Sequence, residues 1–228
     1  MEKIQLKTRD LNLPKLSNQG MESVIYVNKD KLYKIFNEKI DLKIRHDIAQ
    51  FVDSNKNNLD GLILPEEELI LNGCFIGHTM KKYDLTTIDN FFTSDIAYEE
   101  RFKYALKFMN IFNRMNNLGI EHMDFHTDNV FIDKDGNPLI GDVTSIRTRG
   151  VRRRSKIEQL SLIISLLSGY DLMNNGNEFV IEEIISNLGS QKLLDYFYNP
   201  KGNLDSDMFD GFIYNNIEIE EINRKYGG

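Results

Sequence analysis

Three polar residues that could handle a phosphate and its metal stand close together in the sequence. They are Asp124, Asn129 and Asp142, with Asn129 five residues after Asp124 and Asp142 thirteen residues after Asn129. Carboxylate and amide oxygens are ligands that hard cations accept. The types and spacing of these residues indicate a site for a metal-bound phosphate.

A β-hairpin is the element that would bring these residues together. The apolar runs 130–132 and 138–140 flank Asp135-Gly136, and Asp-Gly between two such runs is a strong hairpin signal. The first strand would begin at Asn129 and the second would end at Asp142. Because a hairpin returns its ends to one place, we expect Asn129 and Asp142 to meet beside Asp124.

The composition is that of a chain able to bury a sizeable core. It has 228 residues, 41% of them hydrophobic, and a net charge of −7, which argues against nucleic acid or an anionic membrane as a general partner. Cys74 is the single cysteine, which favours a reducing compartment. With a hydrophilic N-terminus and no apolar run near about 18 residues, we expect a cytoplasmic protein. Delivery into a host cell without a cleavable signal stays open.

The first third of the chain reads as β-rich. Strands are predicted at 22–27 and 31–36 around a turn at 28–30, and at 68–71 and 75–80 around Asn72-Gly73. Between these pairs, residues 38–53 fit a short helix with Ile40, Ile44, Ile48 and Phe51 on one stripe.

The rest of the chain reads as mainly helical. Apolar residues recur at helical spacing from Tyr98 to Leu118, and Gly119 follows as a C-cap. Residues 157–167 predict a buried helix that ends at Gly169, and the tail predicts helices at 179–188 and 191–198. A boundary between the two parts is expected near residues 81–84.

The order of these features resembles the protein-kinase-like superfamily. His122-x-Asp124-x-x-x-x-Asn129 is similar to the kinase catalytic loop, and Asp142 stands where the metal-binding aspartate follows the hairpin. Lys34 is similar to the lysine of the third strand. The resemblance covers residues 17–169. It implies an α+β, two-lobed fold in one domain over 1–228, with an N-lobe to about 80, a hinge at about 81–84 and a C-lobe from about 85.

The resemblance also implies roles for individual residues. Asp124 would accept or orient the proton of the attacking hydroxyl, and Asn129 and Asp142 would hold Mg²⁺. Lys34 would pair with the phosphates of ATP, and His126 would lie near the γ-phosphate. The remaining predicted contacts to ATP are the loop with Gly20 and Ser23, and the hinge residues Met80, Lys81, Lys82 and Tyr83.

Several departures from the family pattern keep alternatives open. The phosphate loop has one glycine, Gly20, and His126 is typical of the aminoglycoside-phosphotransferase branch, so a small-molecule kinase is one alternative. Val143-Thr144 stand where Phe-Gly is expected, and the acid that pairs with Lys34 could be Glu38, Asp41 or Asp47. A pseudokinase binding module is therefore a second alternative. A third, a metallohydrolase-like site, would use the alternating His122, Asp124, His126 and Asp128.

The segment after Asp142 is short and rich in arginine. Its arginines are Arg147, Arg149, Arg152, Arg153 and Arg154. They form either a solvated loop or a docking site for an acidic or phosphorylated partner. Thr144, Ser145, Thr148 and Ser155 are candidate autophosphorylation sites. Met123 replaces the arginine that reads a phosphorylated segment in many protein kinases. The favoured function is a minimal, effector-like protein Ser/Thr kinase that uses Mg-ATP.

Overall fold

The protein has an α+β fold, seen here in a computed structural model. The structure describes residues 1–7, 12–16, 23–37, 42–55, 59–93, 96–142, 145–148, 150–169, 171–173, 178–210 and 212. These residues contain a five-stranded mixed sheet, two smaller sheets and six α-helices. They fall into two compact units, the first made of residues 1–84 with 141–144 and the second of 85–140 with 145–228.

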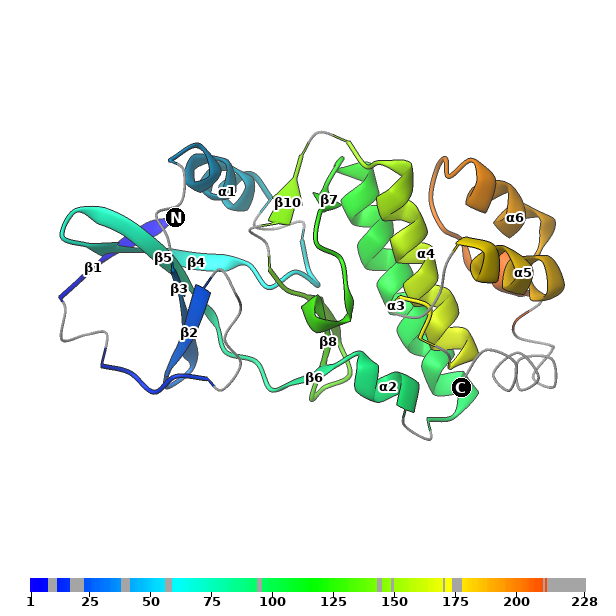
Figure 1. The fold of residues 1–228 in the computed structure, drawn as a ribbon, viewed down its shortest axis with the longest axis horizontal. Helices are drawn as coiled ribbons and strands as arrows, with labels where there is room; N and C mark the ends of the chain where they lie inside the picture. The colour runs from blue at the N-terminus through cyan, green and yellow to red at the C-terminus, as the bar shows by residue number, and fades with distance from the viewer. Residues whose placement is uncertain are drawn as a thin grey trace. The chain divides into compact units, whose positions relative to one another are not determined.

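The first unit is built on the five-stranded sheet, whose strand order is β1-β4-β5-β3-β2 (Figure 1). The strands are β1 (Glu2–Leu6), β2 (Ser23–Asn28), β3 (Lys31–Phe36), β4 (Pro65–Leu71) and β5 (Cys74–Lys81). The pairs β2–β3, β3–β5 and β4–β5 are antiparallel, and β1 runs parallel to β4. The two predicted hairpins are confirmed, whereas β1 was not predicted.

The two hairpin turns explain why these strands form where they do. Lys29 and Asn72 have positive φ angles of 53° and 50°, and Gly73 follows at 76°. Left-handed turn residues match the twist of paired strands, and Asn-Gly is the preferred sequence for such a turn. The Asn72-Gly73 turn therefore sets the pairing of β5 with β4.

Helix α1 (Leu42–Asn55) lies between β3 and β4 in the sequence. Ile48, Phe51 and Val52 are buried. Ile48 and Phe51 belong to the predicted apolar stripe, and their burial agrees with that prediction. Residues 38–41 and the side chain of Asp47 lie outside the described part of the structure. The candidate partners Glu38, Asp41 and Asp47 of Lys34 lie there too.

Two long helices, α3 (Tyr98–Asn117) and α4 (Arg153–Ser168), run side by side in the second unit (Figure 1). The glycines predicted as stops have left-handed φ angles, 67° at Gly119 and 72° at Gly169. Every residue from 159 to 168 of α4 is buried, which confirms the predicted buried helix. Leu118 was expected on the apolar stripe of α3, but it follows the helix and is 42% exposed.

The remaining elements of the second unit are short. They are β6 (Leu85–Thr87), α2 (Asp89–Thr93), β7 (Glu121–His122), β8 (Val130–Asp133), β9 (Pro138–Ile140), β10 (Ile146–Arg147), α5 (Glu178–Leu188) and α6 (Gln191–Tyr198). Strands β8 and β9 form the predicted hairpin, with Val130 opposite Ile140. Among the helices that the structure describes, none combines the length and apolar composition needed to cross a membrane.

Candidate active site

Lys34 and Asp142 form an ion pair in the first unit, although 108 residues separate them in the sequence. The Nζ of Lys34 donates a hydrogen bond to Oδ1 of Asp142. Lys34 is buried in the middle of β3, and strands β2 and β5 pair with it on either side. A buried ammonium needs a carboxylate partner, and Asp142 is that partner here.

The backbone at Asp142 has an uncommon conformation. Its φ angle is 50°, in the left-handed region. Among described residues other than glycine, only Lys29 and Asn72 share this property, and both occupy hairpin turns. A left-handed φ at a non-glycine residue costs about 1–3 kcal/mol and is concentrated at functional sites. The geometry at Asp142 is therefore that of a residue held in place by its surroundings.

His78 lies beside this ion pair, directly opposite Lys34 across the β3–β5 ladder. Burial lowers the pKa of His78 to about 3; the charge of Lys34 acts in the same direction, and Asp142 opposes it. The imidazole is therefore neutral in the folded protein at physiological pH. Sequence reasoning did not single out His78 for this position, because a histidine in an apolar strand resembles any buried polar residue.

Gly77, the residue before His78, lets β5 approach the backbone of Lys34. A Cβ atom added at Gly77 would lie 2.0 Å from the carbonyl oxygen of Lys34. Real Cβ atoms essentially never approach so closely, so the backbone of β3 or β5 would have to shift, which costs more than moving the end of a flexible side chain. Gly77 is thus a requirement for the β3 geometry that holds Lys34.

The structure describes some of the residues that were predicted to contact ATP, and they lie at the start of β2 and at or just after the end of β5. Ser23 begins β2 and is buried, whereas Gly20 lies outside the described residues. Met80 and Lys81 end β5, and Lys82 donates its backbone N–H to the carbonyl oxygen of Asp30 at 2.8 Å. The ammonium of Lys81 lies 5.1 Å from the centre of the Tyr83 ring.

A second polar group, made of Asp124, His126 and Asn129, lies in the second unit on the loop after β7. Asn129 Nδ2 donates to the backbone oxygen of Asp124 at 2.9 Å and lies 3.5 Å from Asp124 Oδ2. The structure therefore brings Asn129 against Asp124, as the sequence predicted. Asn129 directly precedes Val130, which pairs with Ile140 in the β8–β9 hairpin.

His126 lies between the amide of Asn129 and two carboxylates. Its Nε2 is 3.1 Å from Asn129 Nδ2 and 3.3 Å from Asp124 Oδ2, and its Nδ1 is 3.7 Å from Asp128 Oδ2. Its Nε2 can accept from Asn129 in one tautomer of the ring and donate to Asp124 in the other.

The loop that carries Asp124 is held by its neighbours in the sequence. His122 pairs with Ile146 across the β7–β10 ladder, and the Met123 N–H donates to the oxygen of Ser145 at 2.8 Å. Phe125 is buried, with its ring edge against Phe112 of α3. These contacts leave Asp124 exposed between two anchored residues.

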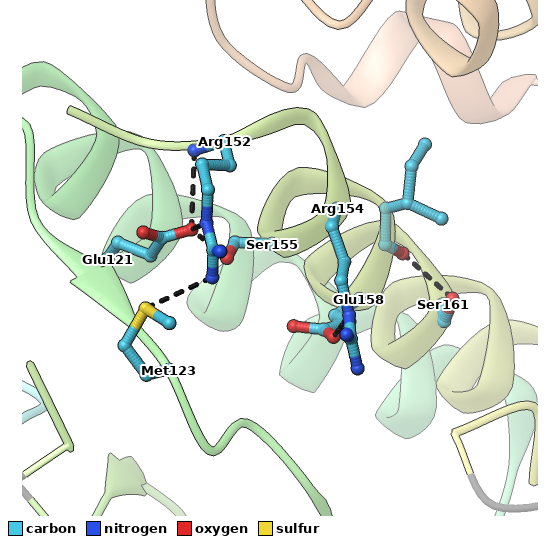
Figure 2. A network of polar contacts seen from close by, with 8 residues as sticks. Glu121, Met123, Arg152, Arg154, Ser155, Glu158 and Ser161 are labelled. Carbon is cyan, nitrogen blue, oxygen red and sulfur yellow. Dashed lines mark hydrogen bonds and ion pairs between the residues drawn. The ribbon is translucent and has the colours of Figure 1, made fainter.

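The arginine-rich segment is partly helical and bonded to acidic residues. Arg152 is the residue before α4, and its Nε binds Glu121 at 2.7 Å; Arg154 Nε binds Glu158 at 2.8 Å (Figure 2). Arg153 and Arg154 therefore belong to a helix and not to a loop, although Arg152, Arg153 and Arg154 are all exposed to solvent as the first alternative expects. The buried Ser155 donates to Glu121 at 2.5 Å, so its hydroxyl is inaccessible to a kinase in the folded protein.

Glu121 was missed by sequence reasoning. Burial opposes ionisation of this carboxyl, but the bonds from Arg152 and Ser155 outweigh it and hold its pKa below the ordinary value. The sequence signal that could have identified Glu121 is its position as an acidic residue between Ile120 and His122.

In the part of the chain that the structure describes, no three His, Cys, Asp or Glu side chains gather in a group able to hold a metal ion. The metallohydrolase-like alternative therefore finds no support in these residues. A scan against protein-family models finds no family that matches the chain. A search of curated proteins finds no relative.

Proposed function

We propose that the protein is an Mg-ATP-dependent phosphotransferase with a two-lobed, protein-kinase-like fold and a hydroxyl acceptor, favouring Ser or Thr of a protein. The observation that carries the proposal is the Lys34–Asp142 ion pair. It joins the two residues for which the kinase resemblance implies phosphate and metal binding. If the motif match were due to chance, there would be no reason for two residues 108 positions apart in the sequence to be bonded.

The arrangement of the sheet supports the same proposal. Strands β2, β3, β5 and β4 are consecutive antiparallel neighbours, with α1 inserted between β3 and β4 in the sequence. Lys34 lies in the middle of β3. This is the order of elements that the resemblance implies for an N-lobe.

Nucleotide binding would use the buried Lys34 for the phosphates and the end of β5 with the residues that follow it for adenine. Lys34 would hold the phosphates as a point charge. The Lys82 N–H is already bonded to Asp30, so polar contacts to adenine would come from the backbone of Lys81 and Tyr83. Gly20 and Ser23 would belong to the loop that covers the phosphates.

Asn129 and Asp142, taken one at a time, each offer an oxygen of the type that Mg²⁺ prefers. The nitrogen of the Asn129 amide donates to Asp124, which leaves the amide oxygen as the ligand, and Asp142 offers a carboxylate. Mg²⁺ prefers such oxygens and commonly takes only one or two carboxylates, with substrate phosphates completing its shell. When bound, the ion would neutralise the charge on the transferring phosphate.

Asp124 would orient the acceptor hydroxyl and receive its proton. Its side chain is 59% exposed, so an acceptor could reach it, while its backbone oxygen is held by Asn129. His126 would bind near the γ-phosphate, and it can donate a hydrogen bond in the tautomer that carries a proton on Nε2.

The test is transfer of radiolabel from γ-labelled ATP with Mg²⁺, to the protein itself and to a generic protein substrate. Asp124→Ala and Asp142→Ala are run beside the wild type. Transfer that disappears in both variants supports the proposal. Transfer to an aminoglycoside but not to protein would favour the small-molecule alternative. Absence of nucleotide binding would overturn the kinase reading altogether.

The pseudokinase alternative rests on one specific feature. The bond between Lys34 and Asp142 engages the two groups that phosphate and metal would need. A binding module could keep this pair closed. Stabilisation by ATP in a thermal-shift measurement, without any transfer, would favour that alternative.

A further inference from the structure

Glu121 is a buried carboxylate three residues before Asp124, and the start of α4 supplies its hydrogen bonds. Its side chain is 4% exposed. Its Oε1 accepts from Ser155 Oγ at 2.5 Å, from Arg152 Nε at 2.7 Å and from the Arg152 backbone N–H at 3.4 Å. A buried charge is tolerated when it is paired and hydrogen-bonded in this way.

Arg152 also reaches past Glu121 to the next part of the loop. One of its terminal nitrogens, Nη2, lies 3.1 Å from the sulfur of Met123 (Figure 2). The backbone of the same stretch pairs with β10 at Glu121 and His122, and the Met123 N–H donates to Ser145, the residue before β10. The side chains of Glu121 and Met123 are therefore held by the start of α4, and the backbone of residues 121–123 is held by β10 and Ser145.

We propose that Glu121 and Arg152 are positioning residues for Asp124, and that they order its loop without phosphorylation of residues 145–155. The effect on transfer rests on the proposed function. An arginine–phosphate contact can order a loop after phosphorylation. The bond between Glu121 and Arg152 would order the Asp124 loop in the same way without any modification. A phosphate on Ser155 would place two negative charges against Glu121, which would break this arrangement.

The pair Arg154–Glu158, which lies within the first two turns of α4, is a matched control. Its bond is also made by an arginine Nε, at 2.8 Å, but the Arg154 side chain is 83% exposed and neither residue is bonded to the Asp124 loop in the described structure. Exposed i,i+4 pairs contribute little to stability. Loss of this pair should leave the loop unchanged.

The experiment measures kcat and the KM for ATP in Arg152→Ala, Arg152→Lys, Glu121→Gln and Arg154→Ala. Misplacement of a reacting group by about 1 Å costs on the order of 100-fold, so we expect kcat to fall about 10- to 100-fold in Arg152→Ala and Glu121→Gln. The KM for ATP should stay within about twofold, because Lys34 and the β5 end are untouched. Arg152→Lys should recover part of kcat, and Arg154→Ala should match the wild type.

Hydrogen exchange at the Met123 amide is the readout that does not need activity. It should be faster in Arg152→Ala and unchanged in Arg154→Ala. If the wild type transfers no phosphate, the proposed function fails, and this exchange alone supports or overturns the positioning role. If the wild type is active, unchanged kcat in Arg152→Ala and Glu121→Gln overturns the inference. Loss of activity on phosphatase treatment, or in Ser145→Ala/Thr148→Ala, also overturns it.

Discussion

The two polar groups of this protein are built in opposite ways. In the first unit, Lys34 and Asp142 have side chains 10% and 19% exposed, and the sheet surrounds the lysine. In the second unit, Asp124 and His126 are 59% and 40% exposed, on a loop whose neighbours are anchored. Under the proposed function, changes at the first group should therefore disturb folding and nucleotide binding together. Changes at the second should alter the proposed phosphate transfer and leave the fold intact.

The largest effect should come from Asp124→Asn. General-base and orienting groups contribute about 10²- to 10⁴-fold to rates, so phosphate transfer should fall about 1,000-fold. The melting temperature should stay within error, because the side chain is exposed and the Asn129 bond goes to the backbone oxygen. Single-turnover kinetics and calorimetry measure the two quantities. A large loss of stability would show that the loop is not independent of its side chain.

The next largest effect is on the stability of the fold in acid, and it depends on His78, which lies beside the buried Lys34–Asp142 pair. The pKa of His78 is about 3 in the folded protein, below the value of about 6.5 in an unfolded chain. The unfolded chain therefore binds the proton first, and stability falls as the pH drops below about 6.5, by about 3 kcal/mol at pH 4. His78→Gln should remove this part of the pH dependence. Denaturant unfolding from pH 8 to pH 4 measures it.

Above about pH 7, the curves of unfolding free energy against pH should run parallel for the wild type and His78→Gln, because His78 is neutral there in both the folded and the unfolded chain. An unchanged acid slope in His78→Gln would contradict the burial of a neutral imidazole beside Lys34.

A third prediction is that Lys34→Met weakens nucleotide use and stability together. The KM for ATP should rise about 100-fold, equivalent to about 2.7 kcal/mol of lost binding to the phosphates. The melting temperature should also fall, because Asp142 loses its ammonium partner while its backbone stays in a left-handed conformation. Steady-state kinetics and calorimetry test both. A raised KM at an unchanged melting temperature would show that the pair is not tied to the sheet.

The smallest effect should come from Gly77→Ala, with Gly73→Ala as its control in the same hairpin. Overpacking against backbone costs about 1–3 kcal/mol, and we expect about 2 kcal/mol at Gly77. At Gly73 an added Cβ meets open space and only the positive φ is strained, which costs about 1 kcal/mol. Denaturant unfolding measures both. Equal losses would show that the approach to the Lys34 carbonyl is not the limiting contact.

The sequence predicted most elements of both units, because their signals are local. Turn chemistry at Asn72-Gly73 located the β4–β5 hairpin, and Asp135-Gly136 located the β8–β9 hairpin. Glycine at 119 and 169 marked the ends of α3 and α4. Each of these signals depends on the backbone conformation of one or two residues.

The contacts made across long sequence distances were harder to predict. Strand β1 has an ordinary mixed sequence, and only its pairing with β4 makes it a strand. The partner of Lys34 was sought among Glu38, Asp41 and Asp47, whose side chains lie outside the described residues. The ion pair that the structure does show, with Asp142, was not predicted. Likewise, nothing local shows that Glu121 would meet Arg152, because that contact depends on where α4 begins.

Equilibrium binding of Mg-ATP to Lys34→Met and Asp124→Asn, beside the wild type, tests the division between the two groups most directly. We expect Asp124→Asn to bind the nucleotide as tightly as the wild type, although its phosphate transfer is about 1,000-fold slower. We expect Lys34→Met to bind about 100-fold more weakly, because the phosphates lose their positive partner. Equal weakening in both variants, or none in either, would contradict the proposed division between the two groups.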